Sequence, residues 1–195
     1  RHPAGKVKPK NVLRMDGMEI KQGNLTLRDA APADAAALGA WWRDGQVMAH
    51  AGFPLGLTIT DNEIAASLQS NPSKTGCLMI IEMDHEPIGE MNYRDLGQAT
   101  AQIGIKICAA PRQNQGIGTT LLRMLINELF FRRGYEKITL DTNLSNTRAQ
   151  HVYEKIGFRK TQVRVDAWTD QLGPAQSAVD YELTKRDYPH PPVSK

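Results

Sequence analysis

A glycine-containing loop between a strand-like segment and a long amphipathic helix is the feature that most constrains the fold of this chain. Residues 103–108 read Ile-Gly-Ile-Lys-Ile-Cys, and their branched side chains alternate as in a β-strand. Residues 113–118 read Gln-Asn-Gln-Gly-Ile-Gly, and the apolar residues after them recur at helical spacing as far as Phe130. Glycines let a ligand approach the backbone closely, and a helix N-terminus presents free N–H groups to an anion. The segment therefore predicts a strand, a loop and a helix that bind a phosphate-bearing ligand.

Two common nucleotide-binding motifs can be compared with this loop. A Walker loop requires Gly-Lys-Ser/Thr, but Gly118 is followed by Thr119 and Thr120, which excludes that motif. A dinucleotide-binding fingerprint requires a third glycine where this chain has Leu121, although Asp141 lies about 20 residues further on. A dinucleotide-binding module therefore stays open as the weaker alternative.

A second block, residues 146–158, reads Asn-Thr-Arg-Ala-Gln-His-Val-Tyr-Glu-Lys-Ile-Gly-Phe. Asn146 and Tyr153 are seven residues apart, which places both on one face of a helix. The loop and this block together resemble the acetyl-CoA-binding core of the GNAT N-acetyltransferase superfamily, whose loop signature is Gln/Arg-x-x-Gly-x-Gly/Ala. The resemblance covers residues 24–185 and is most specific over 101–160. Within the superfamily, the chain loosely resembles bacterial ribosomal-protein N-terminal acetyltransferases and aminoglycoside 6'-N-acetyltransferases.

The predicted order of elements, β-α-α-β-β-β-α-β-α-β-β, favours a mixed sheet with helices on its faces over a purely alternating parallel sheet. It matches the order in GNAT enzymes. The expected fold class is therefore α/β: a GNAT fold with a mixed, mainly antiparallel sheet of six to seven strands and about four helices.

The resemblance implies acetyl-CoA as co-substrate and assigns residues to it. The coenzyme phosphates are expected to meet backbone N–H groups of the loop, and Asn146 to hydrogen-bond the pantetheine arm. A backbone N–H on the preceding strand is expected to stabilise the oxyanion of the tetrahedral intermediate. The expected cofactor-binding residues are Lys106, Ile107, Cys108, Gln113, Asn114, Gln115, Gly116, Ile117, Gly118, Thr119 and Asn146.

An amine must be neutral to attack a thioester, so an N-acetyltransferase benefits from a general base. Asp141, at the end of a predicted strand, matches the acidic position that some bacterial GNAT enzymes use, although it could also be an ordinary strand-terminal acid. Glu90 is the second candidate. Tyr153 matches the tyrosine placed near the thioester sulfur and is the candidate general acid. Direct transfer to the amine requires no covalent acyl-enzyme, so the Cys108 thiol is not expected to act.

The acceptor is expected in the loops after the first helix and between the last strands, where substrate choice resides in this fold. Trp42, His50 and Phe53 are the candidate acceptor-binding residues. Acidic residues of the last loop, Asp166 and Asp170, would suit a cationic amine. The acceptor is a small-molecule amine or a protein N-terminus, and the sequence does not choose between them. A catalytically silent acyl-CoA-binding domain is a further alternative.

Length and charge predict one globular domain. The chain has 195 residues, 41% of them hydrophobic, and a net charge of +3. Residues 1–23 hold six Lys/Arg against two Asp/Glu and are expected to be a disordered basic arm or an extension. The domain is expected over 24–187 and a Pro-rich tail over 188–195.

Several classes of partner are not expected from the sequence. No apolar run is long enough to span a bilayer, and the histidines and cysteines show no metal-ligand spacing. We expect a soluble cytoplasmic protein with no metal, no membrane and no nucleic-acid partner. A homodimer is compatible with the sequence, which does not determine the oligomeric state.

Overall fold

The computed structural model describes residues 17–70, 76–112 and 116–189. The strands are β1 (Glu19–Gln22), β2 (Leu25–Asp29), β3 (Gly76–Met83), β4 (Glu86–Gly97), β5 (Thr100–Ile107), β6 (Lys137–Asn143), β7 (Arg159–Thr169) and β8 (Ala175–Thr184). The α-helices are α1 (Ala35–Trp42), α2 (Gly45–Met48), α3 (Asp61–Ser70), α4 (Ile117–Asn127) and α5 (Thr147–Ile156). A π-helical turn, Glu128–Arg132, extends α4.

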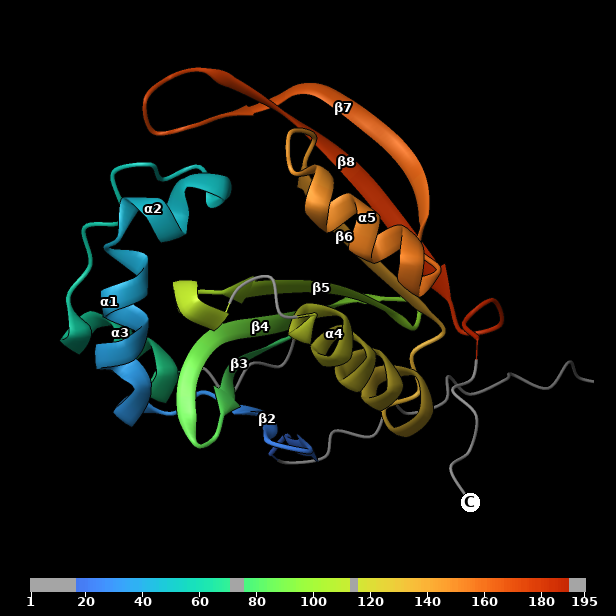
Figure 1. Ribbon diagram of the computed structural model, residues 1–195, viewed down its shortest axis with the longest axis horizontal. Helices are drawn as coiled ribbons and strands as arrows, with labels where there is room; N and C mark the ends of the chain where they lie inside the picture. Colours follow the sequence, from blue (N-terminus) through green and yellow to red (C-terminus); the bar gives the residue numbers. More distant parts are fainter. Residues whose placement is uncertain (1–16, 71–75, 113–115, 190–195) are drawn as a thin grey trace, which may run out of the picture.

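The strands form one mixed sheet in the order β1-β2-β3-β4-β5-β6-β8-β7. Every neighbouring pair is antiparallel except β5 and β6, which are parallel because α4 connects them. Helices α1, α2 and α3 lie on one face of the sheet, and α4 and α5 lie on the other (Figure 1). The expected α/β class with a mixed, mainly antiparallel sheet is confirmed; the described residues form eight strands where six to seven were expected, and five α-helices where about four were expected.

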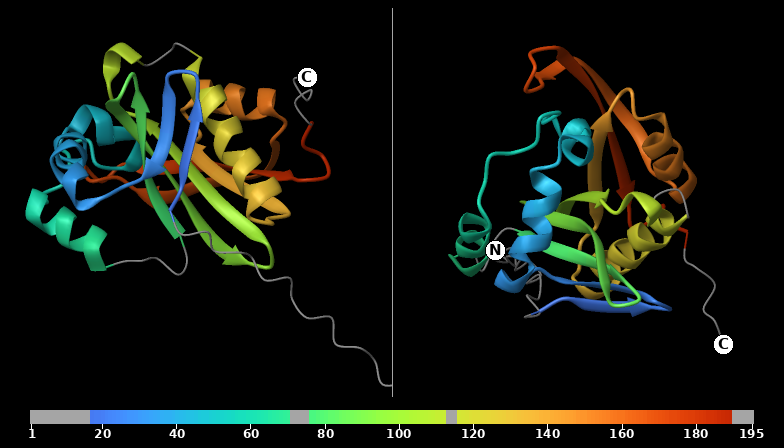
Figure 2. Two further views of the ribbon diagram at one scale, coloured as in Figure 1. Left: turned by 90° about the horizontal axis from the view of Figure 1, so that it is seen from below. Right: turned by 60° about the vertical axis from the view of Figure 1, so that its left-hand side comes forward.

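Alternation along the central strands supplies an apolar surface to both helical layers. On β3, Met79 and Ile81 join the main core beneath α4 and α5, whereas Ile80 packs with Leu38 of α1 and Ile64 of α3. All five side chains are fully buried. The two views of Figure 2 show these helical layers on opposite sides of the sheet. The central strands are thus held from both faces, which fixes the register of the residues between the layers.

The sheet opens between β5 and β6. Residues 100–102 pair in parallel with residues 137–139, and no further pair joins the two strands in the described part of the chain. Strand β5 continues to Ile107 and β6 continues to Asn143. The two strands therefore diverge and leave a gap between their C-terminal halves, about 16 Å long for the five remaining residues of β5.

The sheet begins earlier in the sequence than expected. Residues 19–22, assigned to the basic arm, form β1 and pair with β2, and Met18 is buried. The Met18 N–H donates to the Asp29 carboxylate at 3.0 Å. This edge strand consists largely of exposed polar side chains, so its sequence lacks the apolar alternation that would have identified it. The sheet therefore extends before residue 24, and the part of the arm before residue 17 lies outside the described residues.

Tyr188 also belongs to the fold, although it was assigned to the Pro-rich tail. It is buried, and its ring lies 5.7 Å from that of Phe130 and 6.3 Å from that of Phe131. Its backbone N–H donates to the Thr184 carbonyl. Aromatic packing under the end of β8 thus carries the domain beyond the expected boundary, while residues 190–195 lie outside the described range.

The Tyr188 hydroxyl is buried and lacks a hydrogen-bond partner among the described residues. Burying an unsatisfied hydroxyl costs about 1–3 kcal/mol, so we expect Tyr188→Phe to be at least as stable as the parent protein. Tyr188→Ala removes the ring itself and should lose about 3–5 kcal/mol. Urea unfolding of the three proteins checks this, and a clear loss of stability in Tyr188→Phe would show that the hydroxyl is satisfied.

Two further findings concern partners. None of the helices in residues 17–70, 76–112 and 116–189 is long and apolar enough to cross a membrane. The same residues contain no group of three or more His, Cys, Asp or Glu side chains arranged to hold a metal ion.

Candidate active site

The gap between β5 and β6 exposes backbone polar groups of β5. The Cys108 N–H donates to the Ile88 carbonyl at 2.8 Å, so the even-numbered residues of β5 face β4. Alternation directs the N–H and C=O groups of Ile103 and Ile105 the other way, towards β6. Beyond residue 102 no β6 ladder meets these groups within the described chain. The gap therefore presents a row of backbone donors and acceptors to an extended ligand.

This arrangement alters one expectation about the oxyanion donor. Of the expected residues, Cys108 already donates its backbone N–H to Ile88, and Lys106 lies opposite Glu90 in the β4 ladder. These two N–H groups face β4 and do not face the gap. The backbone of Ile107, between them, is directed away from β4.

The N-terminus of α4 lies after the expected phosphate loop. Gly116 adopts φ of 73°, a left-handed conformation that glycine tolerates, and α4 begins at Ile117. Within the described residues no side chain caps this helix, so its first N–H groups are available to an anion. Ile117, Gly118 and Thr119 lie in this first turn. Gln113, Asn114 and Gln115 lie outside the described residues.

The two loop glycines have different backbone conformations, which predicts opposite effects of alanine substitution on stability. A Cβ at Gly116 would meet no neighbour, but the left-handed backbone should cost Gly116→Ala about 1–2 kcal/mol. A Cβ at Gly118 would lie 3.8 Å from Ile107 Cδ1, an ordinary contact, on a helical backbone. We therefore expect Gly118→Ala to keep or raise stability by up to about 1 kcal/mol. Thermal unfolding of both variants is the measurement, and the reverse order would contradict this account.

The second block forms α5, and Asn146 is its N-cap. The Asn146 Oδ1 accepts a hydrogen bond from the Ala149 N–H at 3.2 Å. The cap uses the oxygen of the carboxamide and leaves its Nδ2 group as the donor for a ligand. Asn146 therefore has a structural function as the cap of α5 and keeps an amide donor for the contact expected with the pantetheine arm.

Tyr153 lies two turns further along α5 and is buried against the sheet. Its ring makes edge contacts with Phe158 at 6.1 Å and Tyr181 at 5.8 Å. Burial, together with the charge of Asp141 and the neighbouring Tyr181, raises the pKa of Tyr153 to about 12. The phenol therefore keeps its proton at neutral pH, as a proton donor must.

Glu90 is the most enclosed carboxylate of the site. It lies on β4 between Ile80 of β3 and Lys106 of β5, so its side chain projects from the α1–α3 face of the sheet. Only 9% of the side chain is exposed. Trp42 of α1 donates its indole N–H to Glu90 Oε2 at 2.9 Å, and Lys106 Nζ lies 3.3 Å from Oε1. The structure thus brings together two expected site residues, Glu90 and Trp42. It also places the Lys106 ammonium beside Glu90, whereas the sequence analysis expected only the backbone of Lys106 to take part.

Asp141, the first candidate base, has different surroundings. Its carboxylate pairs with the Arg164 guanidinium at 3.1 Å, and Arg164 also binds Asp180 at 2.8 Å. The Asp141 side chain is 49% exposed. The Asp141 carboxylate is therefore bound by an arginine and open to solvent, whereas the Glu90 carboxylate is enclosed. The Arg164 contact depends on β7 packing beside β8, which no local pattern around residue 141 indicates.

The Cys108 thiol is buried on the same side as Glu90. Burial, and then the nearby Glu90 charge, raise the pKa of Cys108 to about 12, although Lys106 opposes this shift. The thiolate, which is the nucleophilic form, is therefore scarce at neutral pH.

The two loops expected to hold the acceptor are joined to each other. The Gln171 N–H donates to the Gly52 carbonyl at 2.8 Å, its Nε2 donates to the Gly56 carbonyl at 3.1 Å, and its Oε1 accepts from the Leu55 N–H at 2.8 Å. Gly52 is buried against the Trp168 ring, where a Cβ would come within 2.6 Å of a ring carbon. Figure 1 shows the β7–β8 hairpin reaching over to the α2 segment. No sequence pattern indicates this bridge, because it joins residues more than 100 positions apart.

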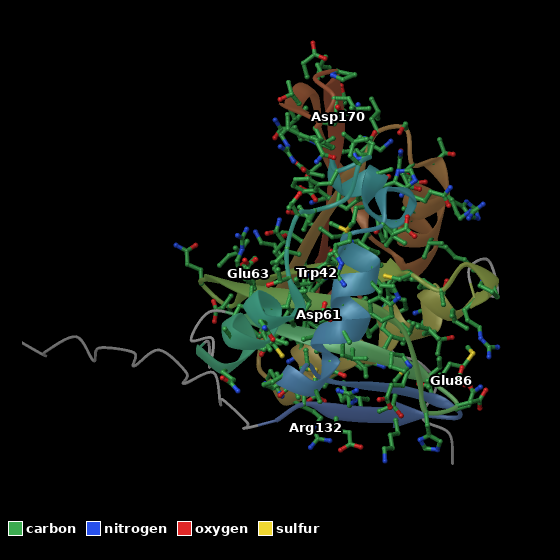
Figure 3. The ribbon with its side chains drawn as sticks, turned by 90° about the vertical axis from the view of Figure 1, so that its left-hand side faces the viewer. Trp42, Asp61, Glu63, Glu86, Arg132 and Asp170 are labelled. Atoms are coloured by element: carbon green, nitrogen blue, oxygen red, sulfur yellow. The ribbon has the colours of Figure 1, made fainter. Side chains whose placement is uncertain are left out.

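The remaining expected acceptor residues, His50 and Phe53, flank Gly52 of this bridge in the chain. His50 is exposed in the short helical turn Ala49–Ala51, and Phe53 is 37% exposed. In Figure 3, Trp42 lies on α1 and Asp170 lies at the tip of the hairpin, on the same side of the molecule. Asp170 accepts hydrogen bonds from the Leu172 N–H and from Gln176 Nε2, so its carboxylate organises the hairpin turn.

Comparison with known families decides what kind of site this is. The sequence pattern of the acetyltransferase (GNAT) domain matches residues 24–159. The chain belongs to the GNAT acetyltransferase family. It is therefore an acetyl-CoA-dependent N-acetyltransferase, as the glycine loop and the 146–158 block had indicated.

Solved structures share the fold of this GNAT chain at low sequence identity. The spermidine N-acetyltransferase from Vibrio cholerae, in complex with CoA and spermine, superposes with a TM-score of 0.77 at 20% identity, covering 85% of this chain and 98% of that one. Ribosomal-protein-S5-alanine acetyltransferase from Vibrio fischeri superposes with a TM-score of 0.76 at 13% identity. The match covers 89% of this chain and 100% of that one. Mycobacterium smegmatis RimJ, in complex with CoA-disulfide, superposes with a TM-score of 0.71 at 21% identity. The match covers 85% of this chain and 84% of that one. No curated protein sequence gives a significant match.

Proposed function

We propose that this GNAT enzyme transfers an acetyl group from acetyl-CoA to a primary amine by direct attack in a ternary complex. The observation that carries the proposal is the gap between β5 and β6, which has the uncapped N-terminus of α4 on one side and the buried Glu90 on the other face of the sheet.

The residues around the gap fit the acetyl donor. An extended pantetheine arm can lie along β5 and exchange hydrogen bonds with the backbone groups directed towards β6. The first turn of α4 supplies N–H groups for the pyrophosphate, and Asn146 supplies its Nδ2 donor. When bound, acetyl-CoA supplies the activated thioester that the amine attacks.

Glu90 is the residue that we assign as general base. The amine reaches the site as an ammonium and has to lose a proton before its lone pair can attack. Glu90 Oε2 is held by the Trp42 indole, whereas Oε1 faces only the looser Lys106 contact. This carboxylate is therefore oriented and enclosed, which favours it over the arginine-bound Asp141. Asp141 remains the competing assignment and is tested beside Glu90.

Direct transfer is favoured over a covalent acyl-enzyme. The buried Cys108 thiol keeps its proton at neutral pH and so is a poor nucleophile. Tyr153 keeps its proton as well and can deliver it to the departing coenzyme thiolate. The amine thus attacks the thioester carbon itself, with Glu90 and Tyr153 handling the two protons.

The acceptor is a primary amine of a small molecule or of a protein N-terminus. Structural neighbours include a spermidine N-acetyltransferase and a ribosomal-protein alanine acetyltransferase, so the fold accommodates both classes. In the described acceptor loops, Asp44 caps α2 and Asp170 binds within its own turn. These hydrogen-bonded carboxylates keep their negative charge, and Asp166 of the hairpin is exposed, so the loops suit a cationic amine of either class.

Calorimetric titration with acetyl-CoA, with NAD as the control ligand, tests the donor. Binding of acetyl-CoA alone, followed by thiol release with at least one amine of a mixed panel, supports the proposal. Binding without turnover on small amines or peptides would identify a catalytically silent acyl-CoA-binding domain. Binding of NAD without acetyl-CoA would identify a dinucleotide-binding module and overturn the catalytic assignments.

The Gln171 bridge predicts an effect confined to the acceptor. Gln171→Ala removes two side-chain hydrogen bonds between the hairpin and residues 55 and 56, each worth about 1 kcal/mol. We expect the KM for the acceptor to rise about 10-fold while the Kd for acetyl-CoA stays unchanged. Gln162→Ala, on the exposed part of β7, is the matched control. Equal effects of the two variants, or a weaker acetyl-CoA complex in Gln171→Ala alone, would contradict a role in the acceptor site.

A further inference from the structure

Lys106 places a primary amine beside the candidate base. It lies on β5, the strand that borders the gap, and its side chain projects from the same face as that of Glu90. Its Nζ lies 3.3 Å from Glu90 Oε1 and 3.2 Å from the Met48 sulfur. The side chain is 25% exposed, so the amine is neither hydrated like a surface lysine nor fully enclosed.

The Lys106 ammonium is held loosely. Charge-assisted N–H···O bonds are typically about 2.7–2.9 Å long, and the contact with Glu90 is longer than that. Its second neighbour, a thioether sulfur, is a weak acceptor. The flexible four-carbon stem of lysine lets Nζ move while Trp42 keeps the other Glu90 oxygen in place. Lys106 can therefore release its partner without displacing the base.

We propose that Lys106 is a self-acetylation site, modified by the enzyme's own acetyl-CoA when no acceptor is bound. The inference rests on the proposed function, which places the thioester in the gap beside β5. Lys106 Nζ occupies the position relative to Glu90 that an acceptor ammonium would take. It is thus an internal acceptor that competes with the external one.

The chemistry balances without a further reactant. Glu90 Oε1 takes one proton from the Lys106 ammonium, and the neutral amine attacks the thioester carbon. The C–N bond forms, the C–S bond breaks, and the coenzyme thiolate takes a second proton that originates from the same nitrogen, directly or by way of Tyr153. The products are Nε-acetyl-Lys106 and free CoA, and protonated Glu90 returns its proton to water.

Self-acetylation would change the site in a defined way. Acetylation removes the positive charge that neutralises Glu90 and replaces it with a neutral amide. In the modified enzyme the Glu90 carboxylate would keep the Trp42 hydrogen bond but lose the Lys106 positive charge. Because no cation then neutralises it, this carboxylate would attract a cationic acceptor. The acceptor protects Lys106 by occupying the same carboxylate, so the extent of modification should fall as the acceptor concentration rises.

The test incubates the purified full chain with acetyl-CoA alone and measures intact mass, followed by peptide mapping of the acetylated lysines. Lys106→Arg keeps the charge but removes the amine nucleophile, and Glu90→Gln removes the base. Lys160→Arg, an exposed lysine of β7, is the matched control. Urea-unfolded protein measures the uncatalysed background.

We expect one acetyl group on Lys106 of the folded protein, retained in Lys160→Arg and absent from Lys106→Arg. The rate in Glu90→Gln should fall about 10²-fold or more. If the protein binds acetyl-CoA and acetylates an external amine but leaves Lys106 unmodified, the inference is wrong while the proposed function stands. Equal acetylation of Lys106 in folded and unfolded protein also overturns it. Failure to bind acetyl-CoA at all would instead remove the proposed function.

Discussion

Replacing Glu90 by glutamine is expected to lower kcat/KM for the amine acceptor by about 10²- to 10⁴-fold, the usual contribution of a general base. Glutamine keeps an oxygen for the Trp42 indole N–H, so the side chain should remain in place. It cannot accept a proton from the incoming ammonium. Because Glu90 lies on the acceptor face and not in the phosphate loop, the Kd for acetyl-CoA should change little. Thiol release at saturating acetyl-CoA measures the first quantity, and calorimetry measures the second.

Two matched variants decide whether the effect belongs to Glu90. Glu86→Gln lies on the same strand, is exposed, and should leave turnover unchanged. Asp141→Asn tests the competing base, and its loss should be smaller than that of Glu90→Gln because Arg164 already holds that carboxylate. A larger loss in Asp141→Asn, with Glu90→Gln active, would move the base to β6 and refute the assignment made from burial.

The sequence predicted the elements whose patterns are local. The strand before the loop, the α4 helix and the capped α5 helix all depend on residues within a few positions of one another, such as Asn146 and Ala149. β1 was missed because an edge strand with polar side chains carries no alternation and is defined by its pairing with β2. Tyr188 was missed for a related reason, since its burial depends on Phe130, far away in the chain.

The preference for Glu90 over Asp141 as the base depends on contacts between residues that are far apart in the sequence. Glu90 is enclosed because the sheet register sets it beside Lys106 and because α1 places Trp42 above it. Asp141 is engaged because Arg164 reaches it from two strands away in the sheet. A sequence pattern can indicate that both residues are carboxylates on strands. Only the fold distinguishes the enclosed carboxylate of Glu90 from the exposed, arginine-bound carboxylate of Asp141.

Tyr153 has the second large expected effect. Tyr153→Phe should lower kcat by about 10- to 10³-fold, within or below the range of acid–base catalysis, because a coenzyme thiolate leaves fairly well without help. Phenylalanine keeps the edge contacts with Phe158 and Tyr181, so the fold should be retained. The Kd for acetyl-CoA should stay nearly constant, since the substitution removes only a hydroxyl.

The pKa of Tyr153 fixes the expected pH dependence of this effect. Burial raises that pKa to about 12, so the phenol is protonated throughout a usual assay range of about pH 6 to 9. Ionisation of Tyr153 therefore cannot produce the alkaline limb of the pH profile, and Tyr153→Phe should lower the whole profile without shifting its limbs. Tyr181→Phe is the matched control, because it removes another buried phenolic hydroxyl, the one that donates to Glu154 at 3.0 Å. Unchanged turnover in Tyr153→Phe, or an equal loss in Tyr181→Phe, would show that the Tyr153 hydroxyl does not deliver the proton to the leaving thiolate.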